Sequence, residues 1–355
     1  MISLKRLFHV SNLDKLRLKT VVYVALFWTV VDFIVVLLRT DEPERRSSLF
    51  FRECLMMSVS LIMSYIFVYK LRRMSRRFPL WLNFLFKSLI LLGSAFLLTF
   101  TVQIINATVV NGESILQALD DIQRYVLYKN WLLEKILFWM AMFFVTQLIL
   151  IINEKYSAGV FLDILVGKYV NPKVENRIVM FMDLKDSTPI AEKLGHALYF
   201  DFIRDFIYRV SQAIIEFEGT IYQYVGDEVV CSWPLSRHNA RRCLDVVIES
   251  RKNIQKRSEV FRRKYDIVPE FRVGIHAGKV TVGEIGVLKK DLAMSGDVMN
   301  TTARIRSACN ELHHNFIVSK DYMEHLDLKG WQAESLGDVE LKGKGNTIGL
   351  FHLRI

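Results

Sequence analysis

The stretch SGDVMNTTARI near the C-terminus holds two residues whose types and spacing could act on a phosphorylated substrate. Asn300 and Arg304 lie four residues apart, so a helix would present both side chains on one face. Arginine offers a planar fork of N–H donors to a charged phosphoryl oxygen, and asparagine can hold a ribose oxygen in line. The pair therefore favours chemistry on a nucleotide.

Two earlier carboxylates could supply metal ions for that chemistry. Asp183 ends the apolar run RIVMFMD, which predicts a buried strand, and Asp227 lies at the expected turn of a β-hairpin. If the first strand pairs with the far strand of the hairpin, both carboxylates meet at one edge of the sheet. There they could hold two Mg²⁺ beside substrate phosphates. Either aspartate alone is equally typical of an ordinary strand end or turn.

Further polar groups could complete a triphosphate site. The loop after Asp183 leads into the start of a helix, where free backbone N–H groups and the helix dipole favour phosphates. The phosphate candidates are Ser187, Thr188, Arg272, Lys342 and Lys344. Lysine and arginine on a surface are usually just solvated, so none of these counts alone.

The elements that must position these residues form an α+β domain. Thr188 and Pro189 predict the start of a helix that continues to Gly219, and a second long helix is expected over residues 238–264. Strand, helix, hairpin, helix, strand is the ferredoxin-like βαββαβ plan, a sheet with helices on one face. A helix near residues 298–309 and C-terminal strands extend this core.

The first part of the chain, residues 1–152, predicts an α-helical membrane domain with four spans. Its apolar runs are Val21 to Leu38, Leu49 to Tyr69, Leu80 to Val102 and Trp131 to Ile152, each near the length of a membrane-spanning helix. Lysine and arginine crowd the segment before the first run and the loop between the second and third, which predicts that both termini are cytoplasmic. We expect a multi-pass protein in the lipid bilayer of the cell (inner) membrane.

Two features of this half leave alternatives open. Its ionisable residues are Asp32, Arg52, Glu53 and Lys87, which could help the helices pack or form a site that senses a ligand or ion. Residues 153–176 predict an amphipathic linker helix, which could be a plain connector or could transmit movement of the spans.

Composition agrees with a chain that lies partly in lipid and partly in water. Of 355 residues, 52% are hydrophobic and 24% charged, which is too apolar for a disordered chain and too charged for one wholly in a membrane. The formal charge is +10, but the basic residues cluster at the loops of the membrane half and predict lipid headgroups as partners, not nucleic acid. Four cysteines without a C-x-x-C pair argue against a disulfide framework or a thiolate zinc site.

Together these motifs resemble the class III adenylyl/guanylyl cyclase family. FMDLKDST and YVGDEVV are similar to its two metal-binding segments, FRVGIHAGKVTVGEIG to its glycine-rich strand pair, GDVMNTTAR to its transition-state helix and LKGKG to its final phosphate turn. The five motifs stand in the family's order. They cover almost all of residues 177–355, which we therefore expect to be a nucleotidyl cyclase catalytic domain.

The resemblance implies a role for each candidate residue. Asp183, Leu184 and Asp227 would bind two Mg²⁺ or Mn²⁺, Asn300 would orient the ribose, Arg304 would stabilise the pentavalent α-phosphate, and Arg272 and Lys344 would hold the outer phosphates. The implied reaction is attack of a nucleotide 3′-hydroxyl on its own α-phosphorus, which yields a 3′,5′-cyclic nucleotide and pyrophosphate. In this family one subunit provides the metal carboxylates and the other the Asn/Arg pair, so we expect a head-to-tail homodimer and an inactive monomer.

The base-binding positions depart from the family's usual patterns. Gln223 stands where adenylyl cyclases usually carry Lys, and Ala293 where they usually carry Asp or Thr; guanylyl cyclases use Glu and Cys. The Gln223 amide could bond an adenine edge, whereas Ala293 offers nothing polar. We favour ATP as substrate, and hence an adenylate cyclase that acts in signal transduction, with GTP or a pyrimidine triphosphate as the alternative.

Two further readings compete with this one. VGDEV superficially resembles the turn of GGDEF-type diguanylate cyclases, but the Asn300/Arg304 helix and LKGKG argue against that reading. The altered base positions also fit a catalytically inactive nucleotide-binding receptor module, although every expected metal and transition-state residue is present.

Overall fold

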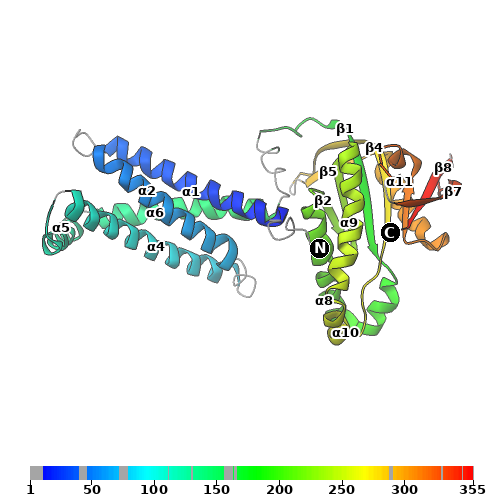
Figure 1. Ribbon diagram of the computed structural model, residues 1–355, viewed down its shortest axis with the longest axis horizontal. Coiled ribbons are helices and arrows are strands. Elements are labelled where there is room, and N and C mark those ends of the chain that lie inside the picture. The colour runs from blue at the N-terminus through cyan, green and yellow to red at the C-terminus, as the bar shows by residue number, and fades with distance from the viewer. Residues whose placement is uncertain are drawn as a thin grey trace, which may run out of the picture. The chain divides into compact units, whose positions relative to one another are not determined.

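The computed structural model describes residues 11–39, 46–71, 79–110, 112–128, 131–155, 163, 166–287, 291–328, 331–345 and 347–354. They divide into two compact units, a helical unit from Asp14 to Lys155 and a mixed α/β unit that follows it (Figure 1).

Helices cover all four apolar runs of the first unit. They are α1 (Asn12–Arg39), α2 (Arg46–Tyr65) with a π-helical end η3 (Ile66–Leu71), α4 (Leu80–Ile105) with a π-helical end η4 (Asn106–Val110), and α6 (Trp131–Lys155). By length and composition two described segments could cross a membrane, Asn12–Val35 and Glu53–Lys70. The apolar windows within α4 and α6 are shorter, Trp81–Leu97 and Ile136–Leu150, so two of the four predicted spans qualify as candidates.

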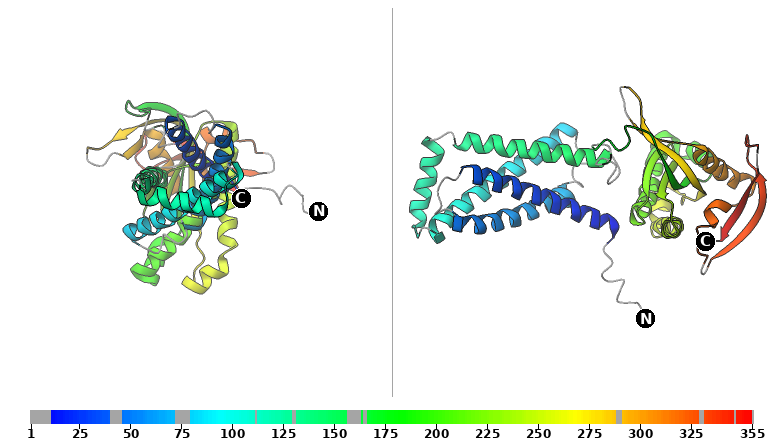
Figure 2. Two further views of the ribbon diagram at one scale, coloured as in Figure 1. Left: turned by 90° about the vertical axis from the view of Figure 1, so that its left-hand side faces the viewer. Right: turned by 90° about the horizontal axis from the view of Figure 1, so that it is seen from above.

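The segment between the third and fourth apolar runs contains a helix that the sequence patterns did not predict. Helix α5 (Ile115–Tyr128) lies across one end of the helical unit (Figure 2). Asp120 and Arg124 form an ion pair of 2.7 Å one turn apart, and Ala118 is buried on another side of the helix. Asp120 and Arg124 thus lie on the exposed side of an amphipathic helix.

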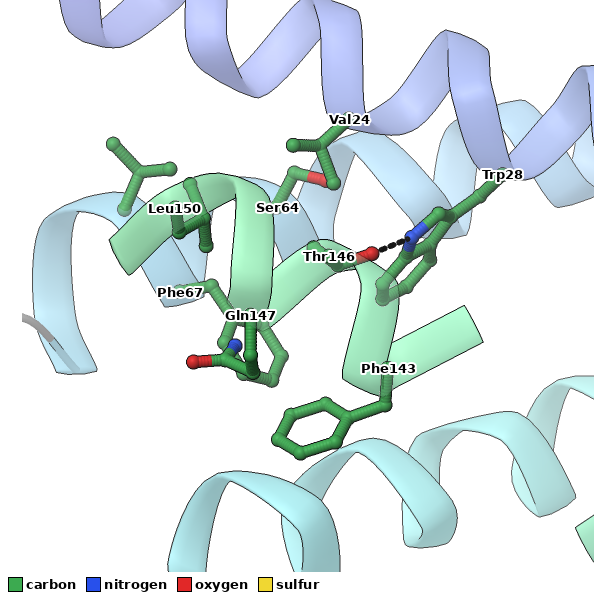
Figure 3. Close-up of a pocket in the computed structure, with 9 residues that line it drawn as sticks. Val24, Trp28, Ser64, Phe67, Phe143, Thr146, Gln147 and Leu150 are labelled. Carbon is green, nitrogen blue, oxygen red and sulfur yellow. Dashed lines mark hydrogen bonds between the residues drawn. The ribbon is translucent and has the colours of Figure 1, made fainter. Parts of the chain in front are cut away.

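The core of the helical unit is packed around two tryptophans, Trp28 and Trp139. Trp28 Nε1 in α1 donates a hydrogen bond of 2.7 Å to Thr146 Oγ1 in α6 (Figure 3). A cavity of about 10 Å³ beside this bond is lined by Ser64 and Gln147, whose Oγ and Nε2 atoms have no hydrogen-bond partner among the described residues. That space holds at most about one water, so this cavity is too small for a molecular ligand.

The second unit is built on an eight-stranded mixed sheet. Its strands are β1 (Lys173–Leu184), β2 (Thr220–Val225), β3 (Glu228–Pro234), β4 (Phe271–Ile285), β5 (Asp291–Ser295), β6 (Phe316–Ser319), β7 (Gln332–Glu340) and β8 (Thr347–Arg354). The strand order is β2-β3-β1-β4-β6-β8-β7, and β5 pairs with β4. The first strand therefore lies beside the far strand of the hairpin, as the βαββαβ plan predicted.

Helices cover both faces of this sheet. They are α8 (Ser187–Glu216), α9 (Arg237–Gln255), α10 (Ser258–Tyr265), α11 (Asp297–Glu311) and α12 (Lys320–Met323). Met180 and Met182 of β1 pack with α8 and α9, while Val179 and Phe181 face the other side together with Val298 of α11. The prediction of helices on one face is thus right for α8 and α9 and wrong for α11.

Several predicted boundaries differ from the structure. The expected helix over 238–264 is broken between Gln255 and Ser258, and β1 begins at Lys173, within the predicted linker helix. Lys173 pairs with Val282, so the strand ladder extends further than the apolar run alone indicated. Most of the remaining linker, residues 156–162, 164 and 165, lies outside the described residues.

The start of α8 also differs from its prediction. The residue that precedes the helix is Asp186, not Thr188, and its backbone is left-handed with φ 57° and no side-chain cap. The Asp186 carboxylate instead accepts a hydrogen bond of 3.2 Å from Arg272 Nη2, which explains why it does not cap the helix. The helix is kinked at Gly195, where φ is 69°.

Candidate active site

Strand alternation directs the polar residues of three strands toward the face covered by α11. Asp183 shares the parity of Val179 and Phe181 on β1, and it pairs directly with Arg272 on β4. Glu228 on β3 shares the parity of Val230, which belongs to the same face. One end of the sheet therefore gathers Asp183, Glu228 and Arg272 beneath α11.

The two predicted metal carboxylates lie side by side. Asp227 follows Gly226, whose φ of 62° forms the hairpin turn, and the pairing of Met182 with Val229 brings this turn to the end of β1. Burial is the largest cause that raises the pKa of Asp183 to about 6; Arg306 acts against it, and the like charge of Asp227 adds to it. The hairpin geometry thus produces the close carboxyl pair that the sequence predicted.

The residues present fit a hard divalent cation. Asp227 Oδ2 is buried and has no hydrogen-bond partner among the described residues, which leaves it available as an oxygen ligand. The Leu184 side chain is buried in the core, so this residue could offer only its backbone carbonyl. Over the described ranges, no group of three or more His, Cys, Asp or Glu forms a metal site. The remaining ligands would therefore have to be backbone groups, water or substrate.

Two residues of this centre were missed from the sequence. Arg306 Nη1 lies 3.2 Å from Asp183 Oδ2, and its Nη2 lies 2.7 Å from Glu228 Oε2. Burial raises the pKa of Glu228, and the guanidinium of Arg306 lowers it. The alternation of β3 could have indicated Glu228, but Arg306 depends on how closely α11 approaches the sheet.

The beginning of α8 borders the same centre. The Ser187 side chain hydrogen-bonds Tyr199, and burial followed by the Asp227 charge raises the pKa of that tyrosine. Tyr199 was also missed, because an aromatic residue within a helix is usually interpreted as part of the hydrophobic core. Thr188 is exposed at the first turn.

The candidate transition-state residues lie on the solvent side of α11. Thr301, Thr302 and Ile305 are buried against the sheet, whereas Asn300 is exposed and Arg304 is partly exposed. A Cβ at Gly343 would lie 3.4 Å from Arg304 Nη2, so the guanidinium sits against the turn that contains Lys342 and Lys344.

The lysine of this turn is held by the start of α11. Lys344 Nζ lies 2.7 Å from Asp297 Oδ2, and this hydrogen bond lowers the pKa of the aspartate. Lys342 is exposed. The pair holds Lys344 at the N-terminal end of the helix that carries Asn300 and Arg304.

The two base-binding candidates flank a link between β2 and β5. The hydroxyl of Tyr222 accepts a hydrogen bond of 3.0 Å from the backbone N–H of Met294. Gln223 is exposed next to this link, and Ala293 pairs with Gly283 on β4. Neither Gln223 nor Ala293 has its own polar side-chain contact here within the described part of the chain.

The candidate metal residues and the candidate transition-state residues form separate clusters in one chain. Among the described residues, no hydrogen bond or ion pair joins Asn300 or Arg304 to Asp183 or Asp227. The only α11 side chain bonded to the metal centre is Arg306, again counting described residues alone. One chain therefore keeps the two candidate clusters apart.

Comparison with known proteins places this domain in one family. The family model described as the adenylate and guanylate cyclase catalytic domain matches residues 170–353, just over half of the chain. The chain belongs to this family.

Individual relatives include both kinds of cyclase. Adenylate cyclase 2 of Rhizobium meliloti is 31% identical over 207 residues, which cover 58% of this chain and 57% of that protein. A receptor-type guanylate cyclase of Caenorhabditis elegans, gcy-14, is 25% identical over 187 residues, 51% of this chain and 16% of that protein. The chain thus spans little more than half of the first relative's length and much less of the second's.

A solved structure shares the fold. A bacterial light-regulated adenylyl cyclase superposes with a TM-score of 0.54 at 18% identity, and covers 61% of this chain and 64% of that one.

Proposed function

We propose that this chain is a membrane-anchored adenylate cyclase that converts ATP to 3′,5′-cyclic AMP and pyrophosphate in signal transduction. The observation that carries the proposal is the Asp183–Asp227 pair, with a buried Asp227 oxygen that lacks a partner among the described residues, beside Arg272. Two carboxyls close together in a partly buried place repel one another when both are charged, and a bound cation offsets that cost. Family membership supplies the reaction type.

The metal residues would be Asp183 and Asp227, with the backbone carbonyl of Leu184. When bound, two Mg²⁺ or Mn²⁺ ions would acidify the 3′-hydroxyl and draw charge from the pyrophosphate that leaves. Arg272 lies opposite Asp183 on the neighbouring strand, close enough to hold the outer phosphates of the same nucleotide. Ser187, Thr188 and the free N–H groups at the start of α8 would add donors to phosphate oxygens.

The transition-state residues would be Asn300 and Arg304. Their i, i+4 spacing on the exposed side of α11 lets both reach one nucleotide, Asn300 at the ribose and Arg304 at the α-phosphate. Lys344 would hold an outer phosphate from the adjoining turn. Because substrate phosphates and the Asp297 carboxylate are both anions, substrate would compete with Asp297 for this lysine.

The active form would be a head-to-tail homodimer. The two clusters are separate within one chain, and a second copy turned to face the first would bring Asn300 and Arg304 of one protomer to Asp183 and Asp227 of the other. Such a twofold arrangement makes two equivalent sites.

The nucleotide is the least constrained part of this proposal. Gln223 can donate to and accept from an adenine edge, and Ala293 leaves room without polarity, so a cyclase of GTP or a pyrimidine triphosphate is the second candidate. The deciding assay incubates the purified chain with each ribonucleoside triphosphate and Mn²⁺ or Mg²⁺. Cyclic AMP that disappears in Asp227→Ala supports the proposal. Cyclic di-GMP, or binding without turnover, would contradict it.

The helical unit would anchor this enzyme with four spans and both termini in the cytoplasm. Two helices qualify as spans by length and composition, and α4 and α6 follow apolar runs of similar total length. Reporter fusions test the topology. A fusion after residue 77 is expected to be cytoplasmic and one after residue 112 external, since basic loops stay inside; the reverse pattern at either point would refute four spans.

A further inference from the structure

The position of Arg306 is fixed by an unusually close approach of α11 to the sheet. A Cβ at Gly274 would lie 2.5 Å from the backbone nitrogen of Arg306 and 2.9 Å from the carbonyl oxygen of Thr302. Only glycine at this point of β4 lets the helix backbone rest there. Gly274 pairs with Phe181, two residues before Asp183 on β1. The backbone of Arg306 therefore lies over β4, near the end of β1 that carries Asp183.

From there the guanidinium contacts two acids of the metal centre. It lies 3.2 Å from Asp183 Oδ2 and 2.7 Å from Glu228 Oε2. All three side chains are shielded, with exposed fractions of 25% for Arg306, 17% for Asp183 and 11% for Glu228. In a shielded place such contacts are weakened little by salt, so they compete effectively for Asp183.

Arg306 is not a second copy of the transition-state arginine. Two residues along a helix turn the side chain by about 200°, so Arg304 and Arg306 point to different sides of α11. Arg304 lies against Gly343, whereas Arg306 lies over the sheet. The two arginines of ARIR therefore serve different half-sites.

The charges around Arg306 leave a place for a further cation. Arg306 contacts Asp183 and Glu228, and Asp227 directly precedes Glu228 in the chain. Asp227 Oδ2 stays buried without a partner among the described residues. A divalent ion that binds both aspartates must displace Arg306 from Asp183. The guanidinium can still contact Glu228, because that contact is the shorter of the two.

We propose that Arg306 is a positioning residue of the metal centre, an internal cation that holds Asp183 until a divalent ion displaces it onto Glu228. The inference rests on the proposed function, because it needs Asp183 to be a metal ligand. Arg306 would thereby weaken metal binding in the absence of nucleotide. It would also keep the side chains of Asp183 and Glu228 ordered when no metal is bound.

Binding of Mn²⁺ to the full-length chain without nucleotide tests this directly. Free Mn²⁺ is measured by its electron paramagnetic resonance signal at pH 8, where Asp183 is ionised. Arg306→Gln is expected to bind Mn²⁺ at least about fivefold more tightly than the wild type, the lower end of typical coupling between two bound groups. Unchanged or weaker binding by a folded Arg306→Gln protein would overturn the proposal.

Arg354→Gln is the matched control. It removes the same charge from an exposed ion pair between Arg354 on β8 and Glu334 on β7, and its Mn²⁺ affinity is expected to match the wild type. An equal gain in both variants would mean a general charge effect and would overturn the inference.

A wild-type structure with Mn²⁺ gives a second test that needs no variant. Arg306 is expected to have left Asp183 while it still contacts Glu228, and an intact Arg306–Asp183 pair beside bound metal would contradict the inference. A wild-type chain that binds no Mn²⁺ and makes no cyclic nucleotide would remove the proposed function as well. Cyclase activity with unaltered Mn²⁺ affinity in Arg306→Gln would remove this inference alone.

Discussion

At the scale of single residues, the metal centre is expected to lower stability in order to bind cations. Asp183 and Asp227 place like charges together in a partly buried site, which costs free energy in the metal-free protein. Functional sites often trade stability for activity in this way. Replacing one member of the pair should therefore separate the two properties.

Asp227→Asn is expected to reduce cyclic nucleotide formation by at least about 100-fold, as loss of one group from a preorganised site typically does. The same change should leave the melting temperature of the metal-free protein equal or higher, because it removes a like charge beside Asp183. Activity and thermal unfolding are measured on the same preparation. Asp338→Asn, an exposed position on β7, is the control and should alter neither. A clear drop in melting temperature for Asp227→Asn would show that the residue is structural.

The raised pKa of Asp183 gives a pH dependence with a definite sign. The folded state keeps this proton up to about pH 6, whereas the unfolded chain releases it near the ordinary value of 3.8. The folded state thus binds more protons between these values, and stability at this site falls as pH rises from about 4 to about 6. Thermal unfolding of the metal-free protein across that range is expected to show the fall, and Asp183→Asn should lack it. An equal fall in both proteins would assign the effect to other groups.

Metal binding should have the opposite dependence, since a metal ligand must be deprotonated. Affinity for Mn²⁺ is expected to increase as pH passes about 6, the pKa of Asp183.

At the scale of elements, the contact between α11 and β4 controls how the metal centre is built. Gly274→Ala would place a Cβ 2.5 Å from the Arg306 nitrogen, so the helix must move away from the sheet. We expect a loss of about 1–3 kcal/mol in the free energy of unfolding, the usual cost of overpacking, measured by denaturant titration. Gly345→Ala is the control for stability, because a Cβ there meets nothing within 4 Å. Equal effects of the two substitutions would refute the close approach.

The sequence could predict those elements that depend on local signals. The apolar run before Asp183 and the glycine before Asp227 define a strand and a hairpin, and the order of elements then fixes their neighbours in the sheet. Asn300 and Arg304 follow from helical spacing in the same way. These predictions needed only periodicity, turn chemistry and family motifs.

The features that the sequence did not predict depend on contacts between distant parts of the chain. Asp186 does not cap α8 with its side chain because Arg272, 86 residues away, binds that carboxylate. Arg306 reaches Asp183 only because Gly274 admits the helix backbone, and the sequence around Arg306 carries no sign of this. Helix α5 was not predicted, because the prediction of helices in this unit rested on the long apolar runs and α5 is an amphipathic helix between two of them.

At the scale of the whole molecule, the proposed enzyme needs a second copy of itself. Each chain would carry a metal half-site on the sheet and a transition-state half-site on α11, and among the described residues no hydrogen bond or ion pair joins Asn300 or Arg304 to Asp183 or Asp227. The helical unit would hold two such chains in one membrane, which restricts how they can meet and favours pairing over free diffusion.

Complementation between two inactive variants measures this central claim most directly. Asp183→Ala lacks the metal half-site and Arg304→Ala lacks the transition-state half-site, so each homodimer should be inactive. Co-expressed in equal amounts, they should form heterodimers with one intact site, and random pairing predicts about a quarter of the wild-type activity. Recovery near that level, with neither variant active alone, is the predicted result. No recovery in confirmed heterodimers would contradict the shared site.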